Sequence, residues 1–260
     1  MIVTTSRRAS PSRGTEAKEW AARLGAAYVP RLGKSMAQLL GEVQVPAVLI
    51  IGEQWPIFMW PERDVEYFFH PNMAKIRLNN LADGRGDPMV TAMDLRRGDT
   101  VLDCTLGRGS DAIVASCVVG PEGRVVGLEV VPIILELTRH GLANYSFDKP
   151  QVDAALRRIE VHCVDHRDYL AGCQDAAFDI VYFDPIFTRP LLDSDAMAPL
   201  RALAAKDTVT IELLAEAKRV ARRRVVIKDV IHSELWAGLG IDTIVRGGGS
   251  RIEFAVVEIA

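Results

Sequence analysis

Short apolar runs alternate with amphipathic and polar segments along the chain, and the alternation changes character near residue 88. In the first part, β-rich runs separated by turn residues predict strands at 2–5, 26–29, 47–52, 56–60 and 65–69. Helical spacing predicts helices at 15–24, 35–40 and 70–81. Because ADGRGDP (82–88) is rich in helix breakers, we expect a boundary between 70 and 88. The predicted domains are a small N-terminal α/β domain over 1–80 and a second domain over 81–260.

The second part alternates predicted strands with predicted helices. The strands fall at 100–104, 124–129, 158–163, 178–184, 223–228, 242–246 and 251–259, and the helices at 110–117, 132–145 and 209–221. This alternation predicts parallel βαβ units. The last two strands flank GGGS (247–250), so we expect them to form an antiparallel hairpin at the edge of the sheet.

Length, composition and charge narrow the class of protein. A chain of 260 residues, with 49% apolar and 25% charged residues, allows one large domain or one domain with a small appendage. The net charge of −3 gives no overall basic field for nucleic acid, although a local basic patch stays open. The densest basic run, KRVARRR (218–224), is either such a phosphate-contacting patch or the charged end of a helix.

The cysteines and the N-terminus bear on redox state and location. Four cysteines (104, 117, 163 and 173) form no CxxC pair and have no histidines at zinc spacing. We therefore expect reduced thiols in or near the core, and no metal site. No apolar run approaches 18 residues, and the first ten residues contain no apolar signal region. These features predict a cytoplasmic protein without a membrane segment.

The strongest candidate chemistry lies in VLDCTLGRGSDA (101–112), where a predicted strand runs into a turn that matches G-x-G-x-x-A. Gly107 and Gly109 would let the backbone approach a ligand, and Glu129, 20 residues beyond Gly109, would accept hydrogen bonds from ribose hydroxyls. Asp103, at the tip of the strand, distinguishes two ligands. Its carboxylate would repel the pyrophosphate of NAD and attract the ammonium and sulfonium of S-adenosylmethionine. We therefore expect S-adenosylmethionine.

A third acid, Asp165, follows the strand at 158–163 and is placed to accept the amino group of adenine. Asp103, Glu129 and Asp165 then lie at three successive strand ends. In an open α/β sheet, these ends share the edge at which ligands bind.

The stretch IVYFDPIF (180–187) ends the fourth strand of this sheet on a carboxylate, a proline and an aromatic ring. Methyl transfer from a sulfonium needs mainly a well-positioned nucleophile and exclusion of water. The exocyclic amine of a base is a poor nucleophile. The carboxylate of Asp184 and the carbonyl of Pro185 would accept its two N–H protons, and Phe187 would stack on the base. These three residues predict amino-group methylation of a planar base.

Five segments, in order, carry a family resemblance: VLDCTLGRGSDAIVAS (101–116), GLEVVP (127–132), VHCVDH (161–166), VYFDPIF (181–187) and RRVVIKD (223–229). They resemble the class I S-adenosylmethionine-dependent methyltransferases. More narrowly, they are similar to the group that includes the small-subunit ribosomal RNA guanine-N2 methyltransferase J and an uncharacterised bacterial branch. The resemblance covers about residues 88–232, and FHPNMA (69–74) and DPM (87–89) also resemble the uncharacterised branch.

The resemblance implies a Rossmann-like, seven-stranded methyltransferase sheet behind the small N-terminal domain, with ribosomal RNA or the small ribosomal subunit as partner. The implied cofactor positions are Ser110, Asp111, Glu129, Val130, Val164, Asp165 and Asp184, beside Asp103, Gly107 and Gly109 from the residues themselves. Thr105, also counted with the cofactor positions, replaces the first glycine of the common motif. Ser110 replaces a basic residue of the ribosomal RNA enzymes, which weakens the transfer of their substrate to this chain.

The first hypothesis is therefore a methyltransferase that modifies an exocyclic amine of guanine in ribosomal RNA, with the N-terminal domain helping to hold the RNA. A methyltransferase for a protein or small-molecule acceptor would keep all the cofactor residues. An NAD-dependent oxidoreductase would use a related fold, although Asp103 and the DPIF motif count against it. A binding module without activity would not need that motif.

Overall fold

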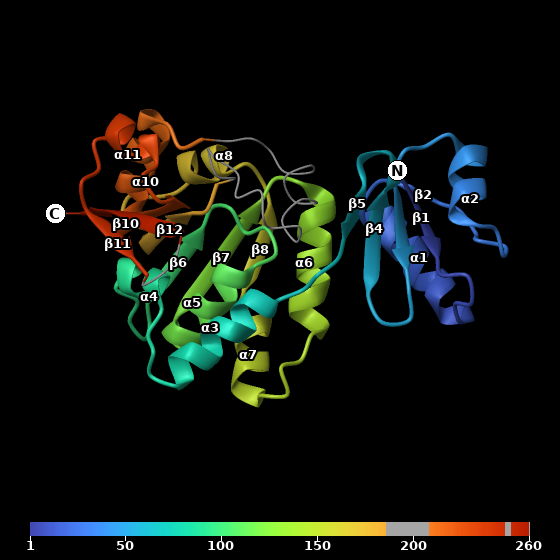
Figure 1. Cartoon of the computed structure of the whole chain (residues 1–260), viewed down its shortest axis with the longest axis horizontal. Coiled ribbons are helices and arrows are strands. Elements are labelled where there is room, and N and C mark those ends of the chain that lie inside the picture. The colour runs from blue at the N-terminus through green and yellow to red at the C-terminus, as the bar shows by residue number, and fades with distance from the viewer. Residues whose placement is uncertain (186–207, 248–250, 260) are drawn as a thin grey trace. The chain divides into compact units, whose positions relative to one another are not determined.

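The structure is a computed structural model of the whole chain, and it describes residues 1–185, 208–247 and 251–259 (Figure 1). The described residues form two compact units, one over Met1–His70 and one that begins at Pro71. Helix α3 (Asn72–Ala82) belongs to the second unit, whereas the expected boundary assigned most of it to the N-terminal domain. The division into domains at residues 80 and 81 stays a prediction.

The first unit contains a five-stranded sheet of order β2-β1-β3-β4-β5. Strand β1 is parallel to β2 and β3, and β3, β4 and β5 are antiparallel. This unit is the small α/β unit with its own sheet that the sequence predicted. Its elements are β1 (Ile2–Thr5), α1 (Pro11–Arg23), β2 (Ala27–Tyr28), α2 (Met36–Val43), β3 (Val48–Ile51), β4 (Pro56–Trp60), the 3₁₀ helix η1 (Pro61–Arg63) and β5 (Val65–Tyr67).

The second unit contains a seven-stranded sheet of order β11-β12-β10-β9-β6-β7-β8. After α3, its elements are α4 (Pro88–Met93), β6 (Thr100–Asp103), α5 (Ser110–Val119), β7 (Arg124–Glu129), α6 (Pro132–Asn144), α7 (Pro150–Arg158), β8 (Glu160–Cys163), α8 (His166–Ala171), β9 (Phe178–Phe183), α10 (Ile211–Val220), β10 (Ala221–Val230), α11 (Glu234–Leu239), β11 (Ile244–Arg246) and β12 (Ile252–Glu258).

This sheet has the Rossmann-like methyltransferase architecture that the resemblance implied. Strands β6 to β10 run parallel, as the βαβ alternation predicted. Strands β11 and β12 are an antiparallel pair, also as predicted. Strand β12 lies between β10 and β11, so the last strand of the chain is not the edge strand.

Alternation of side chains along the strands divides the sheet into two faces. Leu102, Val181 and Val225 point to one face, where they form a buried core with residues of α8, α10 and α11 such as Leu214 and Trp236. The residues one position further along point to the opposite face. Charged and polar side chains near the carboxyl ends of the strands on that second face are the ones that build the site described below.

Among the described residues of the second unit, four helices were not predicted from the sequence: α4, α7, α8 and α11. Three of them have only six residues, too few for a hydrophobic period to stand out. Helix α4 begins directly after the breaker-rich stretch, because the side chain of Asp87 caps it by accepting the N–H of Val90 at 3.1 Å. A local cap therefore outweighs the neighbouring glycines.

The cysteines are free thiols. Cys104 is buried, and Cys117 and Cys173 are half-buried, as expected for core or near-core residues. The expectation is wrong for Cys163, which is exposed at the end of β8.

Candidate functional site

The predicted acids lie along one edge of the large sheet. Strands β6 to β10 are parallel, so their carboxyl ends share this edge. The neighbours of β6 are β7 on one side and β9 on the other, which makes the β6–β9 border the topological switch point. Asp103 ends β6, Glu129 ends β7, Asp165 follows β8, and Asp184 follows β9.

Two glycines with positive φ shape the turn between β6 and α5. Gly107 has φ 50° and Gly109 has φ 72°, which are strained conformations for residues with a side chain. A Cβ on Gly107 would meet only the oxygen of Thr105, at 3.9 Å, so the backbone there is open to a ligand. Gly109 is instead close to Thr138, whose hydroxyl donates to the carbonyl of Gly107 at 2.7 Å. Ser110 begins α5, whose first N–H groups receive no side-chain cap and favour an anionic group.

Glu129 holds the other side of this turn. Its Oε2 accepts the N–H of Gly107 at 3.2 Å, and its Oε1 accepts the N–H of Val131 at 2.9 Å. Burial raises the pKa of Glu129, while these backbone hydrogen bonds lower it. Val130, the next residue, is 42% exposed. An exposed apolar side chain beside a carboxylate suits a nucleoside, whose ring would contact Val130 and whose hydroxyls would reach Glu129.

Asp103 is a buried carboxyl group at the tip of β6, with 2% of its surface exposed. Its Oδ1 accepts the N–H of Thr105 at 3.0 Å. Burial, followed by the negative charge of Asp111, raises the pKa of Asp103 to about 8. A cation beside this group would favour its ionised form, so Asp103 fits the role of a partner for a positively charged ligand.

Asp165 and Val164 follow β8. Asp165 is the N-cap of α8, where its Oδ1 accepts the N–H of Arg167 at 2.8 Å. Val164 is half-buried and packs against the core of the sheet. Both residues lie one strand beyond Glu129, in the order that the resemblance implied.

Asp184 follows β9 at the switch point. Its backbone N–H donates to Oγ1 of Thr105 at 2.6 Å, so the threonine that replaces a glycine of the common motif ties the β6 turn to the end of β9. The side chain of Asp184 pairs with Lys228 of β10 at 2.7 Å. Pro185 is half-buried beside it. Phe187 lies outside the described residues, and its role stays a prediction.

A network of buried charges, not predicted from the sequence, lies beside Asp184. Oδ1 of Asp111 pairs with Arg77 of α3. Oδ2 of Asp111 pairs with Lys228 at 3.1 Å and accepts a hydrogen bond from the hydroxyl of Tyr182 at 2.9 Å. Arg77 also pairs with Asp87 at 2.7 Å. Both carboxylate oxygens of Asp111 thus already have partners within the protein. The assignment of Asp111 to the cofactor stays a prediction.

Only part of this network left a signal in the sequence. Lys228 ends a predicted strand, where a lysine is usually solvated; alternation along β10 gives its face, which is that of Val226, but not its partners. Arg77 gave no such signal, because its partner Asp111 is 34 residues away and α3 has no pronounced apolar face.

The geometry fits a cationic cofactor. Three carboxylates of the network, those of Asp87, Asp111 and Asp184, face the two cations Arg77 and Lys228, so the negative charges are in excess. Asp103, whose charge would add to this excess, interacts electrostatically with Asp111 and Asp184. A ligand with an ammonium and a sulfonium group would compensate these charges, whereas a pyrophosphate would increase the repulsion.

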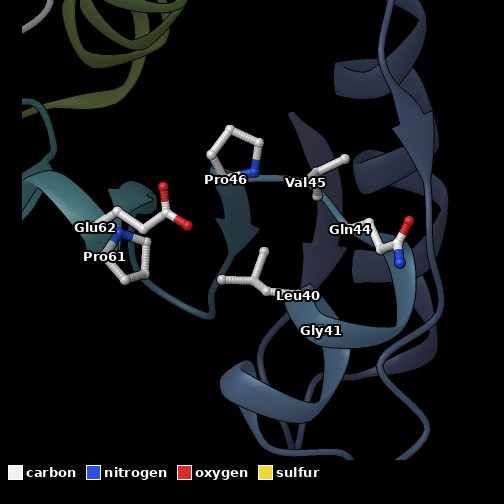
Figure 2. Close-up of a pocket in the computed structure, with 7 residues that line it drawn as sticks. All are labelled: Leu40, Gly41, Gln44, Val45, Pro46, Pro61 and Glu62. Atoms are coloured by element: carbon white, nitrogen blue, oxygen red, sulfur yellow. The ribbon is translucent and has the colours of Figure 1, made fainter.

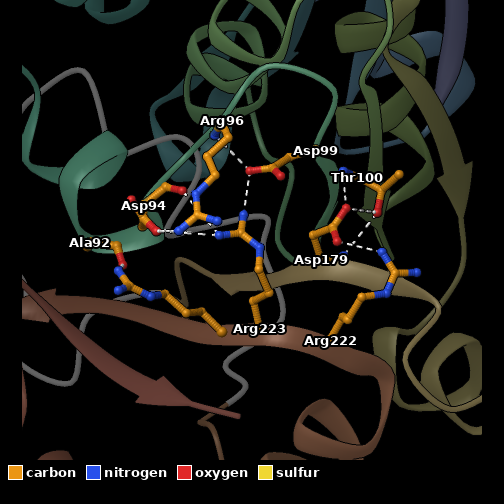
Figure 3. A network of polar contacts seen from close by, with 9 residues as sticks. Ala92, Asp94, Arg96, Asp99, Thr100, Asp179, Arg222 and Arg223 are labelled. Carbon is orange, nitrogen blue, oxygen red and sulfur yellow. Dashed lines mark hydrogen bonds and ion pairs between the residues drawn. The ribbon is translucent and has the colours of Figure 1, made fainter. Parts of the chain in front are cut away.

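The basic run 218–224 lies largely at the opposite edge of the sheet, and its arginines have protein partners (Figure 3). Arg222 pairs with Asp179, and Arg223 pairs with Asp99. Arg224 donates to the carbonyl of Ala92 at 2.9 Å. Arg219 donates to the carbonyl oxygens of residues 170 and 173 at 2.9 and 2.8 Å. These contacts join α10 and β10 to the segments around them, so the arginines of this run serve the fold.

The first unit has a hollow of about 430 Å³ (Figure 2). The side chains of Leu40 and Glu62 point into it from the end of α2 and from η1. Its lining is mostly apolar and contains one ionisable group, Glu62; the residues are Leu40, Gly41, Gln44, Val45, Pro46, Pro61 and Glu62. A lining with a carboxylate and no basic group does not favour RNA phosphate.

Comparison with known proteins identifies the family. The family described as "Putative SAM-dependent methyltransferase" matches residues 63–252. The chain belongs to this family. The methyltransferase is 36% identical over 245 residues to the uncharacterised protein YpiP of Bacillus subtilis, covering 94% of this chain and 95% of that protein. It is 30% identical over 185 residues to ribosomal RNA small subunit methyltransferase J of Chromobacterium violaceum, covering 67% and 69% of the two chains.

A solved structure supports the fold. The SAM-dependent methyltransferase NGO1261 from Neisseria gonorrhoeae superposes with a TM-score of 0.65 over 99% of this chain and 96% of that chain, at 18% identity. The family decides between the two ligands weighed from the sequence, and the cofactor is S-adenosylmethionine rather than NAD. Over the described ranges, no group of three or more His, Cys, Asp or Glu residues could hold a metal ion. Within the same ranges, no helix has the length and apolar character of a membrane span.

Proposed function

We propose that this methyltransferase N-methylates the exocyclic amine of guanine in ribosomal RNA. The observation that supports the proposal most directly is the position of Asp184. Its carboxylate lies at the switch point beside the glycine turn, half-buried and hydrogen-bonded on one side to Lys228. The similarity to ribosomal RNA small subunit methyltransferase J supports the choice of substrate class.

The cofactor, when bound, supplies an electrophilic methyl group on a sulfonium. Asp103, Glu129, Val130, Val164 and Asp165 would bind it, because they line the sheet edge from β6 to β8. Ser110, with the glycine turn before it, would place N–H groups around the cofactor's carboxylate.

The residues after β9 would hold the acceptor. Asp184 would accept one N–H of the guanine amine and the carbonyl of Pro185 the other, which orients the nitrogen lone pair away from the ring plane. Phe187 would stack on the base. Asp184 would take the proton that the amine loses as the new N–C bond forms and the bond from the methyl group to sulfur breaks, which leaves a neutral thioether.

The proposed RNA contact does not depend on the basic run 218–224, whose arginines are paired within the fold. The small N-terminal unit is the proposed RNA-holding part. Nε of Arg7 donates to the carbonyl of residue 33, and the other donors of Arg7 would be the ones available to phosphate, whereas Arg13 is paired with Glu16 and Glu53.

The test is transfer of labelled methyl from S-adenosylmethionine to undermethylated small ribosomal subunits, followed by separation of RNA and protein. Label in RNA that maps to the amino group of a guanine supports the proposal. Asp184→Ala should lower the rate by about 10²–10⁴-fold, the range for loss of an acid–base group. Asp175→Ala, which alters an aspartate that is 80% exposed, is the matched control and should leave the rate unchanged.

Two outcomes would contradict the proposal at different levels. An unchanged rate in Asp184→Ala would remove the proposed role of this carboxylate. Label in ribosomal protein, or absence of label while S-adenosylhomocysteine still binds, would reject the RNA substrate and favour a protein or small-molecule acceptor.

A further inference from the structure

Lys228 and Asp184 meet because of strand register. Asp103 of β6 pairs with Tyr182 of β9, and Tyr182 pairs with Val226 of β10. Side chains two residues apart on a strand share a face, so Asp184 and Lys228 lie one step further along the same face. The register therefore places a carboxylate and an ammonium on neighbouring strands at the edge where the active site lies.

Lys228 is held from two sides. Its Nζ lies 2.7 Å from Oδ2 of Asp184 and 3.1 Å from Oδ2 of Asp111, and 19% of its side chain is exposed. Asp111 is itself fixed by Arg77 on its other oxygen and by the hydroxyl of Tyr182 at 2.9 Å. Besides β10, contacts from α3, α5 and β9 thus determine where the ammonium lies.

The electrostatic balance of Asp184 depends on this ammonium. Burial raises the pKa of Asp184 to about 6, the charge of Lys228 lowers it, and the charge of Asp111 raises it. Burial works against the charged form of Lys228, but Asp111 and Asp184 outweigh it and raise the pKa of the ammonium. Lys228 is therefore a permanent cation, and it is the neighbour that keeps the half-buried carboxylate of Asp184 ionised near neutral pH.

We propose that Lys228 is a positioning residue that keeps the carboxylate of Asp184 ionised and aimed, and that Asp111 and Arg77 serve this purpose by anchoring Lys228. The proposal rests on the function proposed above, because an ionised Asp184 matters only if it accepts a proton from the substrate amine. It also gives Asp111 a role within the protein instead of at the cofactor.

Within the residues that the structure describes, several further titratable groups surround Asp184. Those that face it or its partner come from α3, α5, β6, β9 and β10; they are Arg77, Asp111, Asp103, Tyr182 and Lys228. Among them, Lys228 alone makes a direct ion pair with Asp184 in the described structure. Its removal should therefore shift the titration of Asp184 more than any other single change.

The experiment titrates Asp184 directly by NMR of ¹³C-carboxyl-labelled aspartate, with the signal assigned by its loss in Asp184→Asn. In the wild type, the midpoint is expected near pH 6. In Lys228→Met, we expect a rise of at least one pH unit, and Lys228→Arg, which keeps the charge, should stay close to the wild type. Lys218→Met, which alters an exposed lysine of α10, is the matched control. If Lys228→Met does not fold, Lys228→Gln serves the same comparison.

The pH profile of methyl transfer provides the second measurement. If the midpoint moves from about 6 to about 8, the ionised fraction at pH 7 falls roughly tenfold, and the rate should fall by the same factor and recover near pH 9. An unmoved midpoint in Lys228→Met, or a rate loss that is equal at every pH, would overturn the proposal. If the midpoint of Asp184 moves in Lys228→Met but the wild type transfers no methyl group to RNA, the coupling between Lys228 and Asp184 is supported. Only the proposed substrate is then rejected.

Discussion

The buried carboxyl group of Asp103 should make the protein less stable as pH rises, and the replacement Asp103→Asn should remove this effect. The pKa of Asp103 is raised from an ordinary value of 3.8 to about 8, so the folded chain keeps a proton that the unfolded chain has lost. The contribution of Asp103 to stability therefore falls between about pH 4 and pH 8, because the unfolded state binds fewer protons than the folded state in this range. Above about pH 8 this contribution is level.

The size of the effect follows from the shift. Each pKa unit corresponds to about 1.4 kcal/mol, so ionising Asp103 costs about 6 kcal/mol in full. With a folded pKa of about 8, about 3 kcal/mol of this loss of stability falls between pH 6 and pH 9. With a folded pKa one unit lower, the loss over the same pH range is about 1 kcal/mol. The wild type should thus lose about 1–3 kcal/mol more than Asp103→Asn over this range. Above neutral pH, the variant should be the more stable protein, although its cofactor affinity should fall.

Urea unfolding at pH 6, 7, 8 and 9 measures the difference. Trp236 is the tryptophan of the second unit, so chains in which Trp20, Trp55 and Trp60 are replaced by Phe report on that unit alone. Asp242→Asn, which removes an exposed carboxylate, controls for the change in net charge. Saturating S-adenosylmethionine should reduce the pH dependence of the wild type, because its ammonium favours the ionised carboxylate. The same pH dependence in wild type and Asp103→Asn would refute the reasoning.

Two further changes test contacts that the structure alone revealed. Thr105→Val should slow methyl transfer and destabilise the chain by about 1–3 kcal/mol, because the N–H of Asp184 loses its acceptor at 2.6 Å. Thr105→Ser keeps the hydroxyl and should resemble the wild type in rate and in melting temperature. Arg223→Gln should lower the melting temperature, since it breaks a half-buried pair with Asp99, but should leave the salt dependence of RNA binding unchanged. A decrease of about one in the slope of log affinity against log salt would instead show that this arginine contacts phosphate.

Most of the secondary structure was predictable from the local pattern, although the nine-residue helix α7 was missed. The strands of both sheets have apolar runs bounded by turn residues, and the helices α1, α5, α6 and α10 have helical spacing over ten or more residues. Helix α4, with six residues, depends on one side-chain cap at Asp87, which a hydrophobic pattern does not reveal. Exposure of Cys163 was equally invisible, because it depends on β8 lying at the edge of the sheet.

The sequence by itself determined the chemistry of the sheet edge. Asp103 and Glu129 end strands and Asp165 follows one, and Gly107 and Gly109 are the residue type that a tight strand-to-helix turn favours. Parallel strands then bring these residues to one edge whatever the remaining contacts are. This information is local, and for that reason it could be taken from the chain alone.

Tertiary structure decided which charges pair. Lys228, a strand-end lysine that looks solvated in the sequence, is an internal cation between Asp111 and Asp184, residues 117 and 44 positions away along the chain. The arginines of 222–224 look like a surface for phosphate and are instead bound to acids and carbonyls of the fold. The residue type alone gives the charge of a side chain. The partner with which that charge pairs depends on strand order and register, which long-range packing fixes.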